Sequence, residues 1–190
     1  MKLIAFIPAL AAVLLTTTGC SATEPVSSTE EGATYSLLIQ GYNYTDQYID
    51  SFTVNGVGGG NVFVSDSGSG GGGSVCCYAF DSQRTLPISI KVKWAASYCL
   101  ERKTNPYPFG ERFFDERKTL WKEAEVEVKD VSLPAKALEV HFYPDGHVEA
   151  AVTPGYSPPR LKLPVTADKQ RPGASRSYPF CSHEHLDEVR

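Results

Sequence analysis

The sequence predicts a mainly β fold, a β-dominated α+β domain built as an antiparallel sandwich or a partly rolled sheet with one short helix. Several segments alternate apolar and polar residues with a period of two, and turn signals such as Asn55-Gly56 separate them. A period of two is typical of antiparallel strands with one face buried and the other in water. One segment, residues 111–122, suggests a helix instead.

The first 19 residues have the anatomy of a secretory signal. Lys2 precedes an apolar run, residues 3–15, which is shorter than the roughly 20 residues that a membrane-spanning helix needs. Gly19-Cys20 resembles a bacterial lipobox, although Thr17 stands where Leu, Val or Ile is usual. The resemblance implies a lipid on Cys20, and Ser21 favours an outer-membrane protein that faces the periplasm. The alternative is an ordinary cleaved signal beside a chance cysteine.

The chain after the signal is interpreted as a tether and one domain. Residues 20–32 are polar, contain Pro25 and lack an apolar period, which predicts a flexible tether. Residues 33–190 are long enough for a single domain with a core. The chain has 18 Lys and Arg against 22 Asp and Glu. This mild acidity argues against a nucleic-acid partner, which favours a basic stripe.

The cysteines beyond Cys20 are disulfide candidates in an oxidising compartment. Adjacent cysteines rarely bridge each other because the small ring strains the peptide between them, and in a strand their side chains point to opposite faces. We therefore expect one of the adjacent pair to bond one of the two distant cysteines, with room for a second such bridge. The choice among the pairings stays open for Cys76, Cys77, Cys99 and Cys181.

Two strands have the clearest pattern, residues 87–94 and 123–131, and their outer faces carry opposite charges. One interpretation is that they pair, and the other is that each charged face meets only water. Pairing would place two lysines beside two glutamates: Lys91 and Lys93 beside Glu125 and Glu127.

Three further elements complete the expected fold. Residues 137–152 predict a hairpin around Pro144-Asp145-Gly146, in which the glycine takes the left-handed position. Residues 111–122 predict the short helix, because its four large apolar residues would share one face. The chain is proline-rich from about residue 153, which predicts an extended wrap with Cys181 as a candidate pin.

Residues 68–77, GSGGGGSVCC, are the least usual stretch. A phosphate-binding loop needs a lysine and a helix after its glycines, whereas a β-prone segment follows here. The stretch is interpreted either as a mobile connection or as a loop with unusual backbone angles that enters another protein's cleft. The second interpretation makes three glycines candidate contacts: Gly70, Gly71 and Gly72.

A tyrosine-rich stretch, residues 41–48, offers a second candidate surface. Tyrosines are amphipathic anchors that are common at protein interfaces. The alternative is a structural role, in which these tyrosines close one end of the fold. The candidate anchors are Tyr42, Tyr44 and Tyr48.

Cys181-Ser182-His183-Glu184-His185 combines ligand types that suit zinc. It has no matching pair upstream, and only the fold could bring His141 or His147 to it. Cys181 is also the more natural disulfide partner in an oxidising compartment. We therefore predict no metal, no cofactor, no catalytic residue and no enzymatic activity.

Three segments together resemble a family of small Gram-negative lipoproteins of undefined function: GYNYTDQYIDSFTVNGVGGGN, CCYAF and HFYPDGHVEAAVTP, within residues 35–154. Members of that family are often encoded beside phospholipase effectors of the type VI secretion system, and an immunity role is attributed to them. The resemblance implies two partners, the membrane through the lipid and a cognate lipase toxin. The alternative is a structural or envelope-assembly lipoprotein that binds a resident envelope partner.

Overall fold

The computed structural model describes residues 34–174 and 177–182. The chain divides into two units, residues 1–30 and 31–190, and the described residues all belong to the second. The expected signal, the lipid site at Cys20 and the tether lie outside the described residues. Within the described part, no helix is long and apolar enough to cross a membrane.

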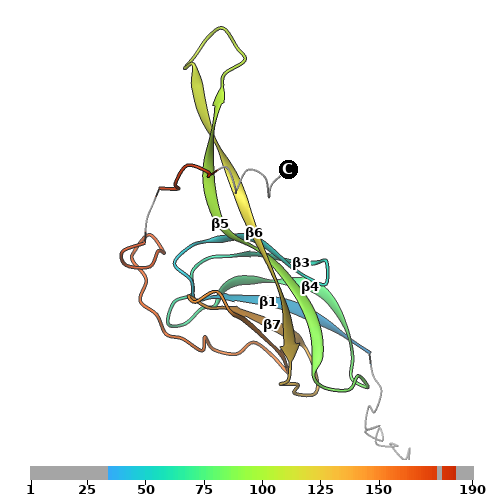
Figure 1. Cartoon of the computed structure of the whole chain (residues 1–190). Helices are drawn as coiled ribbons and strands as arrows, with labels where there is room; N and C mark the ends of the chain where they lie inside the picture. Colours follow the sequence, from blue (N-terminus) through green and yellow to red (C-terminus); the bar gives the residue numbers. More distant parts are fainter. Residues whose placement is uncertain (1–33, 175–176, 183–190) are drawn as a thin grey trace, which may run out of the picture. The chain divides into compact units, whose positions relative to one another are not determined.

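The described residues form one eight-stranded sheet, in the order β6-β5-β2-β3-β4-β1-β7-β8 (Figure 1). All neighbouring strands are antiparallel except β1 and β7, which are parallel. The strands are β1 (Thr34–Asn43), β2 (Ile49–Val54), β3 (Val57–Val62), β4 (Gly71–Asp81), β5 (Ile88–Thr104), β6 (Phe113–Val128), β7 (Ala137–Phe142) and β8 (Val148–Thr153).

The sheet is rolled so that its two edges approach each other, which confirms the partly rolled sheet. At the end of β6 the chain pairs with β8 through a parallel bridge between Val131 and Val152. The amide of Val152 donates to the carbonyl of Asp130 at 2.9 Å, and the amide of Ser132 donates to that of Val152 at 2.9 Å. These bonds join the two edges at one point of a curled half-barrel.

The core fills the inside of this half-barrel. Phe52 is fully buried and meets the ring of Phe142 edge-on, with centroids 5.3 Å apart. A Cβ at Gly59 would overlap the Phe52 ring, so glycine makes room for it on β3. Burying a ring of this size contributes about 1.5–3 kcal/mol. Fully buried aliphatic side chains from five strands surround this pair, among them Leu37, Val54, Val62, Val92 and Val140.

The expected pairing of the two charged strands is confirmed. β5 and β6 form an antiparallel ladder in which Lys91 lies opposite Glu125 and Lys93 lies opposite Glu123. The ammonium of Lys91 also reaches Glu123 at 2.9 Å. Glu127 lies opposite Ser89 and not opposite a lysine, so this part of the prediction is wrong.

The expected hairpin is confirmed as β7 and β8, with Val140 opposite Ala150. Gly146 takes the left-handed conformation, with φ of 88°, and its amide donates to the carbonyl of Tyr143 at 3.0 Å. The turn signal in the sequence therefore marked the correct residue for the positive φ.

The helix predicted at residues 111–122 is wrong, because β6 continues as a strand through this segment. Its backbone hydrogen-bonds to β5 as far as the pair formed by Thr104 and Phe113. Neighbouring side chains point to opposite faces in a strand, so Phe113 and Phe114 do not share a buried stripe and are 44% and 47% exposed. Pairing with a long neighbouring strand overrides the weak helical pattern.

The expected cysteine pairing is also wrong, because Cys99 bonds Cys181 and neither bonds Cys76 or Cys77. The ladder between β1 and β4 is irregular at this point, since Leu37 lies opposite Tyr78 and Leu38 opposite Cys76. Cys77 is thereby left without a ladder partner, and the regular alternation that should separate the two side chains is interrupted. The bond to Cys181 confirms a pin on the proline-rich tail.

We predict that replacing Cys99 and Cys181 together with alanine lowers the free energy of unfolding by about 2–5 kcal/mol, because their bond closes a long loop in the unfolded chain. The two cysteines are 82 residues apart. Urea unfolding of the oxidised protein measures the loss, and the reduced wild type serves as the matched control. An unchanged unfolding midpoint would contradict the assignment of this bond.

Candidate functional site

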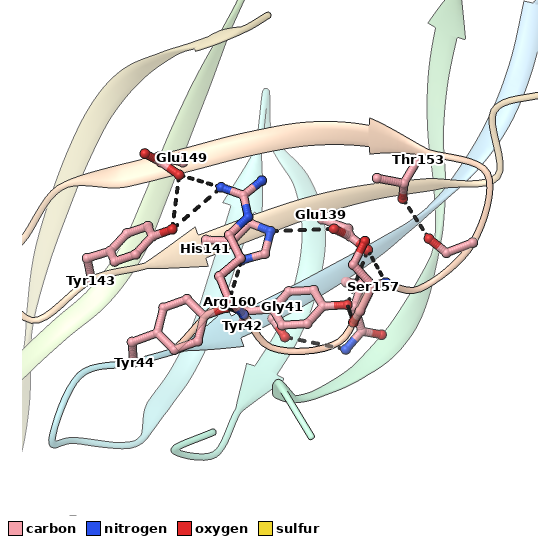
Figure 2. A network of polar contacts seen from close by, with 12 residues as sticks. Gly41, Tyr42, Tyr44, Glu139, His141, Tyr143, Glu149, Thr153, Ser157 and Arg160 are labelled. Carbon is pink, nitrogen blue, oxygen red and sulfur yellow. Dashed lines mark hydrogen bonds and ion pairs between the residues drawn. The ribbon is translucent and has the colours of Figure 1, made fainter. Parts of the chain in front are cut away.

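Ionisable side chains converge on the face of β1 and β7 that points away from the core (Figure 2). β1 and β7 run parallel with Tyr42 beside His141, and with Gln40 beside Glu139. The alternate residues of β7, such as Val140, point into the core. Tyr42, Tyr44, Glu139 and His141 are nevertheless 0–2% exposed, because the tail covers this face. The tail is the chain after β8, described at residues 154–174 and 177–182.

Glu139 is the centre of the contacts to the tail. Its Oε1 accepts the backbone N–H of Ser157 at 2.6 Å and lies 3.2 Å from the hydroxyl of Tyr42. That hydroxyl also lies 2.7 Å from the carbonyl oxygen of Ser157, so its one proton can be donated to either acceptor. The buried Glu139 side chain thus links β7 to the backbone of the tail.

His141 connects Glu139 to Tyr44. Its Nδ1 lies 3.1 Å from the Tyr44 hydroxyl and its Nε2 lies 3.5 Å from Glu139 Oε2. The Tyr44 hydroxyl in turn accepts the backbone N–H of Arg160 at 2.8 Å. A neutral imidazole with its proton on Nε2 lets Tyr44 donate to Nδ1, whereas Nε2 lies 3.5 Å from the carboxylate without forming a regular hydrogen bond to it.

The charge states follow from burial and hydrogen bonding. Burial lowers the pKa of His141, which keeps the imidazole neutral at pH 7, and Glu139 opposes this shift only in part. Burial by itself would raise the pKa of Glu139, but its interactions with His141 and the Ser157 amide outweigh burial and hold that pKa below its ordinary value. The group at this site is therefore a carboxylate beside a neutral histidine.

These six residues, Tyr42, Tyr44, Glu139, His141, Ser157 and Arg160, are called the tail network below. A histidine between a tyrosine and a carboxylate is an arrangement that could transfer protons. The four side chains that come from the sheet are covered by the tail, however, whereas Arg160 is exposed and forms an ion pair with Glu149. The arrangement as described therefore joins the tail to the sheet, with the histidine and the carboxylate buried.

A second buried contact fixes the tail farther along the chain. The guanidinium of Arg171 is 8% exposed and donates to the carbonyl oxygens of Ser65 at 2.5 Å and Asn43 at 3.2 Å, and to the hydroxyl of Ser65 at 2.8 Å. Burial lowers the pKa of Arg171. Carbonyl dipoles replace the water around this cation, so the tail is locked to the segments that follow β1 and β3.

The predicted tyrosine anchors have structural positions. Tyr42 and Tyr44 belong to the tail network, so neither is available as an exposed anchor and the structural interpretation holds for both. Tyr48 is half-buried, accepts a hydrogen bond from the Asn61 amide at 2.6 Å and packs on Phe63 with ring centroids 4.9 Å apart. The sequence could not reveal the burial of Tyr42 and Tyr44, because the tail residues that contact them lie more than a hundred residues away.

The predicted glycine contacts are packing positions. A Cβ at Gly70 would overlap the Tyr42 ring, and one at Gly72 would lie 2.7 Å from the carbonyl oxygen of Gly41. Gly71 has a φ of 91°, and its Cβ would overlap the carbonyl of Phe63. Gly71–Gly73 begin β4 rather than forming a mobile connection, so these glycines allow β4 to pass close to β1.

The candidate metal residues are not gathered by the fold. Cys181 bonds Cys99, and His183 and His185 lie outside the described residues. His147 is exposed on the β7–β8 turn, where it stacks on Tyr143 and contacts Asp145. In residues 34–174 and 177–182, no group of three or more His, Cys, Asp and Glu is placed to hold a metal ion.

The aromatic side chains with the greatest exposed fractions lie on a β ribbon that the sequence did not predict. β5 and β6 continue beyond the rest of the sheet and form an arm, residues 97–120, whose root contacts the body and whose outer part stands clear of it (Figure 1). Its tip, residues 105–112, carries Tyr107 and Phe109, which are 65% and 73% exposed. Large exposed aromatic residues of this kind are typical of binding surfaces.

Residues 42–150 match the family described as "Protein of unknown function (DUF3304)". The chain belongs to this family. The DUF3304 segment begins at Tyr42 in β1 and ends at Ala150 in β8, so it includes the arm, Glu139 and His141. The tail lies beyond it. No curated protein and no solved structure matches this DUF3304 chain.

We predict that stability falls with pH below about 6.5, the ordinary pKa of histidine, and that His141 contributes to this fall. The pKa of His141 is lower in the folded chain than in the unfolded chain, so the unfolded chain binds the proton first as pH falls, and folding is disfavoured. Urea midpoints between pH 5 and pH 7.5 measure the effect. The loss should be smaller in His141→Gln than in the wild type, and parallel curves for the two proteins would contradict it.

Proposed function

We propose that this chain is a lipid-anchored protein of the outer membrane, facing the periplasm, that acts by binding another protein and not by catalysis. Within that proposal, the partner is a lipase effector of a type VI secretion system, which the chain blocks as an immunity protein. The lipobox-like Gly19-Cys20 supports the anchor, and the resemblance of residues 35–154 to lipoproteins encoded beside such effectors supports the partner.

The observation that carries the proposal is the distribution of chemistry over the described fold. The histidine and carboxylate that could transfer protons are covered by the tail, with 1% exposure or less. In contrast, the most exposed large apolar side chains of the described chain include a group of aromatic residues on the arm. Burial of exposed aromatic residues is a main source of affinity between proteins, so this distribution favours binding over turnover.

The direction of the arm supports a role away from the anchoring membrane. β1 and β5 run in the same direction, because three antiparallel partners, β4, β3 and β2, separate them. Thr34 therefore lies at one end of the sheet and the arm extends from the other (Figure 1). A protein held through its N-terminus would expose the arm to partners that arrive in the periplasm.

We expect a lipase effector gene beside the gene for this chain, and two assays with that lipase test the proposal. The purified proteins should form a complex, and co-expression should protect cells from the periplasmic lipase. Cys20→Ala should leave the purified complex unchanged but reduce protection, because the anchor concentrates the inhibitor at the membrane that the lipase attacks.

The absence of both a complex and protection would remove the immunity proposal. Co-purification with a resident envelope protein in place of the lipase would favour the structural or envelope-assembly alternative. Equal protection by the wild type and Cys20→Ala would refute the anchor alone.

A further inference from the structure

The arm is a two-stranded ribbon along most of its length. β2 hydrogen-bonds to β5 only as far as the pair Phe52 and Trp94. Beyond Trp94 the ladder between β5 and β6 continues from the pair Ser97 and Leu120 to the pair Thr104 and Phe113. The ribbon therefore projects beyond the core and presents its tip at a distance from the body (Figure 1).

The root of the arm is braced by the tail. The amide of Leu100 donates to the carbonyl of Pro179 at 2.8 Å, and the amide of Cys181 donates to the carbonyl of Leu100 at 2.9 Å. The Cys99–Cys181 bond fixes this contact, and the guanidinium of Arg102 lies 4.7 Å from the ring centroid of Phe180. The tail thus acts as a short third strand on the β5 side.

The other strand of the arm is held to the body. Arg117 of β6 forms an ion pair with Asp50 at 2.6 Å and lies over the ring of Tyr98, 4.7 Å from its centroid. Contacts on both strands restrict the angle between arm and body. A braced arm loses less conformational entropy on binding than a free hairpin would.

The tip is fixed from within by Asn105. Its side-chain amide donates to the carbonyls of Phe109 at 3.2 Å and Glu111 at 2.9 Å, and its Oδ1 accepts the amide of Tyr107 at 3.0 Å. Gly110 supplies the left-handed turn with a φ of 88°. The rings of Tyr107 and Phe109 stack at 5.7 Å and stay exposed. The tip is a preorganised loop with an aromatic pair at its end.

The charges of the arm do not favour a membrane surface. The tip has one acid and one base, Glu111 and Arg112, and therefore lacks the cationic excess that binds anionic lipids. The charged residues next to the tip are neutralised by ion pairs within the ribbon: Arg102 contacts Asp115 at 2.8 Å and Lys103 contacts Glu116 at 2.8 Å. An aromatic, electrically balanced tip instead matches protein clefts, whose walls are mostly apolar.

We propose that the tip is an insertion loop that enters an apolar cleft of a folded partner protein, with Tyr107 and Phe109 as its anchors. A ribbon two strands wide is narrow enough to enter a cleft, and aromatic anchors in such pockets carry much of the binding energy of an interface. This inference deepens the proposed function by naming the surface and the kind of site that it fits. It requires a protein partner but does not require that partner to be a lipase.

Site-specific photo-crosslinking of the full chain in its own cells tests the proposal. A photoreactive phenylalanine analogue replaces Phe109 in one version and Tyr156, which is 54% exposed but remote from the arm in sequence, in a matched control. We expect a protein adduct from position 109 alone, with the crosslinked peptide lining an apolar pocket of that protein. Tyr107→Ser should weaken the affinity of the purified complex about tenfold or more, and Tyr156→Ser should leave it unchanged.

Three results would overturn the insertion loop. They are equal adducts from positions 109 and 156, adducts that map to a flat surface of the partner, and adducts with lipid accompanied by binding to vesicles of phosphatidylethanolamine and phosphatidylglycerol. A cleft adduct with a protein that is not a lipase would sustain the insertion loop while refuting immunity. Protection from the lipase without an adduct at position 109 would sustain immunity while refuting the loop.

Discussion

The described fold depends on the contact between the Glu139 carboxylate and the tail. An ionised carboxylate cannot be buried beside apolar strands unless donors replace the water that it loses. The Ser157 amide and the Tyr42 hydroxyl take that role, and His141 Nε2 lies 3.5 Å from the other carboxylate oxygen. Because they do, both faces of β7 are interior, one against the core and the other against the tail. The contact thus converts a polar strand face, which would ordinarily meet water, into a second buried layer.

The tail connects this layer to the arm. It crosses the tail network, passes the carbonyl groups that surround Arg171, and ends beside β5 at the disulfide with Cys99. The same segment therefore covers the residues that could transfer protons and braces the ribbon that presents exposed aromatic side chains. The cover over the buried histidine and carboxylate and the support of the arm therefore both depend on where the tail runs. Since the DUF3304 match ends at residue 150, the arm belongs to the family segment and the tail that braces it lies outside.

Local patterns in the sequence predicted the elements that local physics determines. The β7–β8 hairpin follows from alternation and from a turn in which only Gly146 needs a positive φ, and the pairing of β5 with β6 follows from two half-buried faces with opposite charges. The helix failed because residues 113–122 take their conformation from a long partner strand. The burial of Tyr42, Tyr44 and Glu139 could not be predicted for a related reason, since it comes from the tail, which is distant in sequence. The arm could not be predicted, because nothing in its alternation says where neighbouring strands stop pairing.

Hydrogen exchange at the Ser157 and Arg160 amides measures whether the tail covers the buried face of β7. Both amides belong to the proline-rich tail and donate to side-chain oxygens, of Glu139 and Tyr44, and not to a β ladder. The account predicts that at pH 7 they exchange far more slowly than an unstructured chain and approach the protection of the β7 amides. Exchange of both at the unstructured rate, with β7 still protected, would show that the tail does not cover this face and would contradict the account.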